Sequence, residues 1–266
     1  MNLSNRSLLW LNIGSFILMI VLNTAGSFGW LNDRTVAEIS DRYATLLTPA
    51  GYAFVIWTLI YLLLIGFLWY QWKAHREGQN GDSLEPAGIW FALSNLFNGL
   101  WIVAWLNDFI GVAMLLMIGL LVSLFQLVMR LRLEVWDAPV RIIMFVWWPI
   151  CIYIGWITLA APVNLAAWLK SVFDTPPFFS GEFWAIISLA CLTTVYIVWT
   201  QWRNMREASL VAVWGLVAIA VQQWSTSWVV GLFALACSAL LLAVATAHAL
   251  RNKATWPQNK LKRGEF

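Results

Sequence analysis

Long apolar stretches run through this chain from end to end. A helix needs roughly 20 apolar residues to cross about 30 Å of hydrocarbon. Eight stretches approach that length: residues 7–30, 49–72, 87–106, 109–129, 139–161, 181–201, 209–223 and 227–250. The connections at 107–108 and 224–226 are so short that their flanking helices should form tight hairpins. The pattern predicts an all-α polytopic membrane protein with eight transmembrane helices.

The composition excludes the main soluble classes. Of 266 residues, 61% are hydrophobic and only 11% are charged, whereas soluble domains are about 45–50% apolar and about 25% charged. A soluble fold of this size could not bury so much apolar surface. The net charge is only +3, and the basic residues form no single patch. We therefore expect membrane lipid around the chain and no nucleic-acid partner.

The basic residues predict the orientation. With eight helices, the face that carries both termini holds 13 Lys and Arg residues, and the other face holds only Arg34, Arg42 and Lys170. Cytoplasmic loops carry the excess of Lys and Arg, so both termini are expected in the cytoplasm, with a bacterial inner (plasma) membrane as the host. The first stretch also has features of a signal peptide, and its cleavage would leave the basic loops on the same face.

The polar connections suggest three further features. Residues 31–48 carry acidic and Arg side chains three and four apart, which predicts a short helix in either a solvated connector or a lid. Residues 73–86 resemble a flexible polar linker, and the basic tail 254–266 should lie near anionic lipid. Glu134 and Asp137 lie close in sequence to Arg132 and Arg141, which predicts a salt-bridged surface.

The spans lack the residues that chemistry and ion coupling require. No Asp, Glu, Lys or Arg lies near the middle of any stretch, and such residues mark transport and proton pathways. No paired nucleophile and base, metal-ligand spacing or phosphate loop is found either. We therefore assign no catalytic or metal-ligating residue, require no cofactor, and favour a function other than an enzyme.

Tryptophan is the most unusual component, with 20 residues. Many of these lie at the ends of spans, as in an interfacial aromatic belt, but others lie deep within them. An indole N–H in hydrocarbon needs a hydrogen-bond partner, and Asn residues are available nearby. Two interpretations stay open here: a pocket for a flat, mostly apolar ligand, or interhelical packing. The deep residues are Trp57, Trp101, Trp147, Trp148, Trp156 and Trp214.

Three segments together resemble a known family. They are TPAGYAFVIWTLIY at 48–61, NLFNGLW at 95–101, and WITLAAPVN at 156–164 followed by Trp168. In order and helix number they resemble the tryptophan-rich sensory protein/translocator protein (TspO/MBR) family. That family has five helices, and its second-helix motif has a further proline. The resemblance predicts a five-helix bundle at 1–170, a three-helix extension at 171–253 with no counterpart, and a cytoplasmic tail at 254–266.

The resemblance also implies a cavity between the helices, covered by the loop after the first helix. Trp156, Ala160 and Asn164 lie four residues apart and so share one helical face. The other positions come from matching the motifs. The implied ligand-binding residues are Tyr52, Phe54, Trp57, Tyr61, Asn98, Trp101, Trp156, Ala160 and Asn164.

Family ligands include porphyrins, haem and sterol-like molecules. We therefore expect a membrane receptor or sensor for a planar lipophilic small molecule, with porphyrin or haem as a ligand rather than a cofactor. The alternatives are a transporter of a lipophilic metabolite without ion coupling and, less favoured, a porphyrin-degrading enzyme. Small residues along the last helix also fit a structural partner or a homodimer.

Overall fold

The computed structural model describes residues 4–173 and 180–265. Residues 1–3, 174–179 and 266, at the edges of the expected units, lie outside this range. Within it the chain is all-helical and has no strand, which confirms the expected class. The long helices are α1 (Asn5–Ser27), α3 (Ile56–Arg76), α5 (Trp90–Leu106), α6 (Ile110–Arg130), α8 (Trp148–Val172), α9 (Gly181–Arg203), α10 (Arg206–Gln223) and α11 (Trp228–Arg251).

Short helical turns complete the fold. The α2 helix follows α1, and η1 leads directly into α3. A π-helical turn, η3, joins α7 to α8, so that these three run as one segment from Val140 to Val172. The short elements are α2 (Val36–Arg42), η1 (Gly51–Val55), η2 (Asn80–Asp82), α4 (Leu84–Ala87), α7 (Val140–Ile142), η3 (Ile143–Trp147), η4 (Lys253–Thr255) and α12 (Pro257–Lys262).

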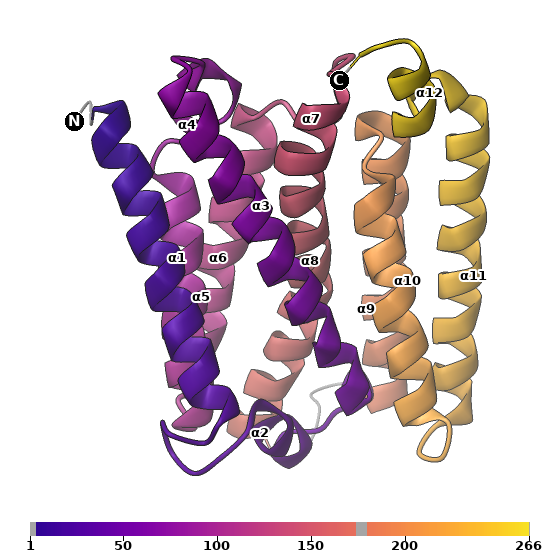
Figure 1. Cartoon of the computed structure of the whole chain (residues 1–266). Coiled ribbons are helices and arrows are strands. Elements are labelled where there is room, and N and C mark those ends of the chain that lie inside the picture. The colour runs from indigo at the N-terminus through magenta and orange to yellow at the C-terminus, as the bar shows by residue number, and fades with distance from the viewer. Residues whose placement is uncertain (1–3, 174–179, 266) are drawn as a thin grey trace.

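Among the described residues, six segments are long and apolar enough to cross a membrane. They are Asn5–Ser27, Gly51–Arg76, Ile110–Arg130, Val140–Val172, Gly181–Arg203 and Trp228–Arg251. The α5 helix is apolar but has 17 residues, and α10 has 18 residues and is not one of the six. The long helices run side by side, with both termini at one end and α2 at the other (Figure 1). We call these the termini end and the lid end.

Glycines let α1 and α5 approach closely. A Cβ on Gly99 would lie 2.9 Å from Leu22 Cδ1 and 3.5 Å from the backbone of Met19. A Cβ on Gly26 would lie 2.8 Å from Leu106 Cδ1. Small residues allow such approach where apolar burial gives little driving force between helices. The resulting α1–α5 contact forms one side of the space described below.

The α8 helix lies at the centre of the molecule and is longer than expected. The sequence pattern predicts an end at residue 161, but the helix continues through Pro162 to Val172. A proline removes one helical hydrogen bond, and such losses are tolerated in membrane helices where neighbouring groups compensate. The continuation keeps Asn164 on the same face as Trp156.

The C-terminal helices pack directly on α8. A Cβ on Gly155 would lie 2.9 Å from the Cα atom of Ala208, so α8 and α10 nearly touch at their backbones. A Cβ on Gly215 of α10 would lie 2.5 Å from Leu159 Cδ1. The α9 and α11 helices both contact α10. The division into units at 1–170, 171–253 and 254–266 stays a prediction.

The termini end differs from expectation at two connections. The segment after α3 is folded rather than a loose linker, because η2 and α4 bury Ser83 and Leu84. The tail folds back as α12, where buried Lys260 pairs with Asp137 and Glu265. The Val140 N–H also donates to the Glu265 carbonyl at 3.0 Å. Pairing within the chain thus satisfies Lys260 and Arg263, whereas Lys262 stays exposed, and the position of the tail near anionic lipid stays a prediction.

The predicted salt-bridged surface around Glu134 is wrong. Asp137 pairs with Lys260, and Arg141 lies 4.0 Å from Asp82. Glu134 is buried in a turn at φ +59°, and its Oε1 has no hydrogen-bond partner. Burial, and then the nearby Glu207, raise the pKa of the Glu134 carboxyl well above its ordinary value, although Arg206 acts in the opposite direction. Sequence spacing alone cannot show that a turn residue points inward.

Candidate ligand-binding site

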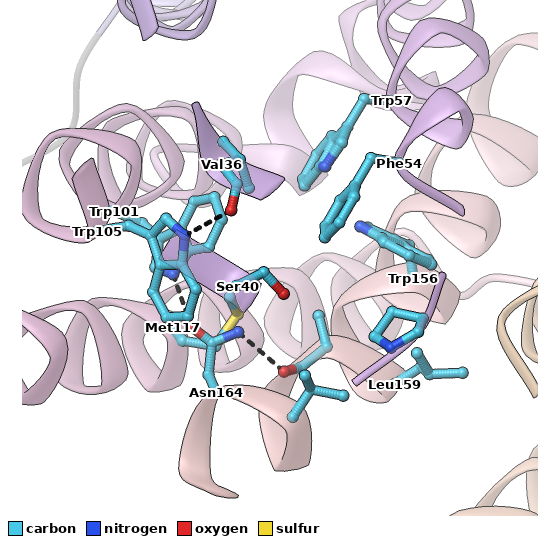
Figure 2. Close-up of a pocket in the computed structure, with 13 residues that line it drawn as sticks. Val36, Ser40, Phe54, Trp57, Trp101, Trp105, Met117, Trp156, Leu159 and Asn164 are labelled. Atoms are coloured by element: carbon cyan, nitrogen blue, oxygen red, sulfur yellow. Dashed lines mark hydrogen bonds between the residues drawn. The ribbon is translucent and has the colours of Figure 1, made fainter. Parts of the chain in front are cut away.

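A narrow aromatic cleft lies between α5, α6, α8, η1 and α2 near the lid end (Figure 2). Its volume is about 30 Å³, which is room for about one or two water molecules. Aromatic rings form most of the walls, with one neutral amide at the base. The lining residues are Val36, Ser40, Pro49, Phe54, Trp57, Trp101, Trp105, Met117, Trp156, Leu159, Ala160, Val163 and Asn164.

A wider chamber shares part of this wall. Its volume is about 370 Å³, within the roughly 300–1,000 Å³ typical of small-molecule sites. Val36, Phe54, Trp57 and Trp101 border both spaces, so the chamber and the cleft adjoin. The chamber is more polar than the cleft. Its lining residues are Asn23, Ser27, Thr35, Val36, Ala37, Gly51, Phe54, Trp57, Thr58, Tyr61, Trp101 and Ile102.

Two short stretches of sequence place the rings on one side of the cleft. The η1 turn presents Phe54, the first turn of α3 presents Trp57, and α8 presents Trp156 (Figure 2). Trp156 meets Phe54 with ring centroids 6.2 Å apart and Trp57 with centroids 6.4 Å apart, both at 83°. Edge-on contacts of this kind contribute about 0.5–1.5 kcal/mol beyond burial. They hold the three rings as one wall.

A hydrogen-bonded pair closes the opposite side. The Trp101 indole N–H donates to Asn164 Oδ1 at 2.9 Å, and Asn164 Nδ2 donates to the Ala160 carbonyl at 3.0 Å. Trp101 also stacks on Trp105, with centroids 5.6 Å apart. These bonds tie α5 to α8 and satisfy both polar side chains. Here the packing interpretation holds, and the open space lies beside this pair.

The structure brings most of the sequence-predicted residues together. Phe54, Trp57, Trp101, Trp156, Ala160 and Asn164 line the cleft, and Tyr61 lines only the chamber. Asn98 lines neither: its Oδ1 accepts from Asn23 Nδ2 at 2.8 Å, and its Nδ2 donates to the Tyr153 hydroxyl at 2.9 Å. It supports the chamber through Asn23. Tyr52 also lies elsewhere, with its ring edge-on to Trp214 of α10.

Several lining residues were absent from the sequence-predicted set. Trp105 lies four residues after Trp101, so helical periodicity alone indicates that it shares the same face. Asn23 and Ser27 carried a weaker signal, since both are polar residues late in an apolar helix. Val36 and Ser40 carried none. They reach the cleft only because α2 folds back over the bundle.

The α2 segment covers the cleft and is fastened from several directions. Thr35 and Glu38 form a capping box that starts the helix. Arg34 and Arg42 both pair with Asp108, which lies at φ +61° in the α5–α6 turn. Such partly exposed pairs contribute about 0–1 kcal/mol each. We call residues 31–48 the lid.

Backbone contacts add to the fastening of the lid. Asn32 Nδ2 donates to the Leu106 carbonyl at 3.0 Å, and the Trp105 indole N–H donates to the Val36 carbonyl at 3.3 Å. The second bond joins the lid to the aromatic wall itself. Movement of the lid would therefore displace Trp105 from its hydrogen bond as well as uncover the space.

The linings are neutral. None of the described residues that line the two spaces carries a formal charge. The walls offer ring faces and apolar side chains for dispersion contacts. They also offer the hydroxyl and amide groups of Asn23, Ser27, Thr35 and Thr58 for hydrogen bonds. This chemistry suits the broad apolar body of a ligand, and the linings themselves supply no charged partner.

The family model for TSPO-like protein matches residues 9–247. The chain belongs to this TSPO-like family. The match includes nearly all of α9–α11, so in this TSPO-like protein the C-terminal helices lie within the part that the family describes. No curated protein and no solved structure matches the chain. Membership and the apolar helices make it an integral membrane protein of a sensor or binding type.

Proposed function

We propose that this protein binds a flat lipophilic molecule of the porphyrin, haem or sterol class and acts as a membrane receptor or sensor for it. The observation that carries the proposal is the chamber of about 370 Å³ that adjoins an aromatic cleft covered by the lid. Its lining supplies ring faces and neutral polar groups. That combination fits a ligand with a broad apolar body and a few polar substituents.

The two spaces suggest how the ligand is held. The polar substituents of the ligand lie in the chamber, near Asn23, Ser27 and Thr58. The apolar edge of its ring system points into the cleft between Trp101 and Trp156. The cleft as it stands is too narrow for a ring system. Binding therefore requires the walls to part, and we propose that the lid, which covers the cleft, moves to allow this.

We further propose that the chain crosses the membrane eight times. The α5 helix runs beside the longer helices α1 and α6, and α10 runs beside the longer helices α8 and α11 (Figure 1). A short span can be accommodated by local thinning of the bilayer. With eight crossings, both termini share the basic, cytoplasmic face of a bacterial inner membrane. Cysteine labelling of the lid and the tail from each side of the membrane tests this topology.

Titration with protoporphyrin IX tests the binding function. Saturable quenching of tryptophan fluorescence is expected, and Trp101→Phe, Trp156→Phe and Asn164→Ala should each weaken binding about tenfold, a loss of about 1.4 kcal/mol. Trp228→Phe is the matched control, because Trp228 is 65% exposed on the outside of the bundle. Unchanged affinity in all three variants would show that the site is elsewhere. Absence of saturable quenching in the unmodified protein would refute the function.

A further inference from the structure

The C-terminal helices contact the site at its hinge. The lid ends at residue 48, and the chain then runs through Pro49 and Ala50 into η1. The Ala50 N–H donates to the Ala218 carbonyl of α10 at 3.0 Å, and the Trp214 indole N–H donates to the Ala53 carbonyl at 3.1 Å. Both bonds join α10 to the segment that presents Phe54. An element far away in sequence thus fixes the base of the aromatic wall.

Gln223 extends this contact into the lid. Its Nε2 donates to the Thr48 carbonyl at 3.0 Å and to the Thr45 carbonyl at 3.3 Å. The side chain is buried, with 3% exposure, so these bonds are shielded from water. A buried carbonyl that loses its hydrogen-bond donor destabilises the fold. Gln223 therefore holds the last residues of the lid against α10, whereas the partly exposed ion pairs act at Arg34 and Arg42, near the two ends of the α2 helix.

Gly215 contacts the site from behind. Leu159 lines the cleft, and its Cδ1 lies 2.5 Å from where a Cβ on Gly215 would stand. Leu159 thus occupies room that only a glycine on α10 leaves. Any larger residue at 215 would push the flexible end of the Leu159 side chain away from α10. Because Leu159 borders the cleft, its side chain would then move into the cleft and narrow it.

We infer that α10 sets the width of the cleft and the position of the lid hinge. Gly215 is a specificity-determining position and Gln223 a positioning residue for the ligand. This inference rests on the proposed function for its ligand preference, whereas the hinge contacts can be tested without any ligand. It also gives the C-terminal helices a role: they form the outer support of a site whose walls come from the first five long helices.

Gly215→Ala tests the width of the cleft. Dissociation constants are measured for protoporphyrin IX, a large flat probe, and for 2-naphthol, a small one. One methyl group in an apolar pocket changes affinity about 10-fold to 200-fold, so we expect at least a tenfold loss for protoporphyrin and less than a threefold change for naphthol. Gly14→Ala is the control, because nothing lies within 4 Å of its Cβ position. Equal losses for both probes would overturn the specificity role.

Gln223→Leu tests the hinge without a ligand. Amide hydrogen exchange should speed up at residues 45–53 but not in α1, and Gln222→Leu, at the exposed neighbour, should leave both unchanged. Uniform acceleration throughout the chain, or none at the hinge, would overturn the positioning role. If the variant does not fold, the unmodified protein still decides: protoporphyrin should slow exchange at residues 45–53 and 214–223 together. Slowing at neither segment, despite saturable quenching, would refute the inference alone.

Discussion

The two ends of this bundle differ in where they place charged side chains and in whether space is left between the helices. At the lid end, uncharged side chains border open space, and exposed ion pairs to Asp108 close it. At the termini end, Lys260 and Glu134 are buried, and folded connections fill the space between the helices. Charged groups at the lid end thus lie outside the cavity, where they attach the lid, whereas charged groups at the termini end are buried within the fold. The difference is one of filling: open space lies among the side chains of the lid end, whereas folded connections pack over the termini end.

The largest expected effect comes from Asn98, which supports the chamber. Asn98→Leu removes the partner of both Asn23 and the Tyr153 hydroxyl, and buried groups left unsatisfied cost about 1–3 kcal/mol. We expect a loss of about 2 kcal/mol in the free energy of unfolding, measured in detergent, with weaker ligand binding. Thr194→Val on α9 is the control, because Thr194 is exposed and bonds only within its own helix. Equal stability of the Asn98 and Thr194 variants would contradict the view that the Asn23–Asn98–Tyr153 hydrogen bonds stabilise the chamber.

A smaller effect of opposite sign is expected at Glu134, at the termini end. Its folded-state pKa is raised above 4.5, chiefly by burial, so the folded chain keeps a proton that the unfolded chain has lost. Stability therefore falls as pH rises from about 4.5 through the raised pKa. Glu134→Gln should reduce this fall and stabilise the protein by about 1 kcal/mol at neutral pH.

Thermal unfolding of the Glu134 variant between pH 4 and pH 8 provides the measurement. Glu77→Gln is the control, because Glu77 is exposed and only 4.0 Å from Lys73 in a weak surface pair. If the stability of the Glu134→Gln variant and of the unmodified protein depended on pH in the same way, burial of Glu134 would not destabilise the fold at neutral pH. The proposed contrast between the two ends would then be weakened.

Asp108→Asn should affect kinetics more than stability. It removes the partner of Arg34 and Arg42, and exposed pairs contribute only about 0–1 kcal/mol. We expect protoporphyrin to dissociate a few times faster, with a larger difference at low salt, because screening weakens these pairs in the unmodified protein. Asp41→Asn, at an exposed lid position, serves as the control. Identical dissociation rates would mean that the ion pairs do not restrain the lid.

The smallest effect is local to the tail. Arg263 and Lys260 lower the pKa of Glu265 to about 2, so this contact is present above about pH 4.5 and is lost as the pH falls toward 2. The protection factors of the amide hydrogens at residues 257–265, which correct for the intrinsic pH dependence of exchange, should therefore fall across that range, and the Lys260→Met variant should show low protection factors at every pH. A tail that stays protected in this variant would be held by contacts other than the ion pairs.

Sequence alone predicted the helices more accurately than the connections. Apolar length located most of the long helices to within a few residues of their ends. The exceptions are α3, which begins after the η1 turn, and α8, which follows α7 and η3 and continues through Pro162. The polar spacing in the lid correctly indicated a short helix. The segment after α3 and the turn at Glu134 were misjudged, because the burial of a polar connection depends on what packs over it.

The site shows the same limit. Trp156, Ala160 and Asn164 share one helical face by arithmetic alone, and the structure places all three on the cleft. Asn98 fits the same motif-based reasoning, yet Asn23 and Tyr153 draw its side chain into a separate network. Which face of a helix borders a cavity depends on the neighbouring helices. A sequence motif identifies residues, but it does not determine which side chains pack against them.

The amino-acid sequence by itself determined that this chain is a bundle of apolar helices, rich in tryptophan and without charge at mid-span, because hydropathy and periodicity are local properties. Only the tertiary structure decided where the bundle stays open. The contacts of Gly215 with Leu159 and of Gln223 with Thr48 join residues more than 50 positions apart, and no local pattern specifies such pairs. A cavity forms where the side chains of neighbouring helices do not fill the space between them. Its position is therefore fixed only when the helices have packed together.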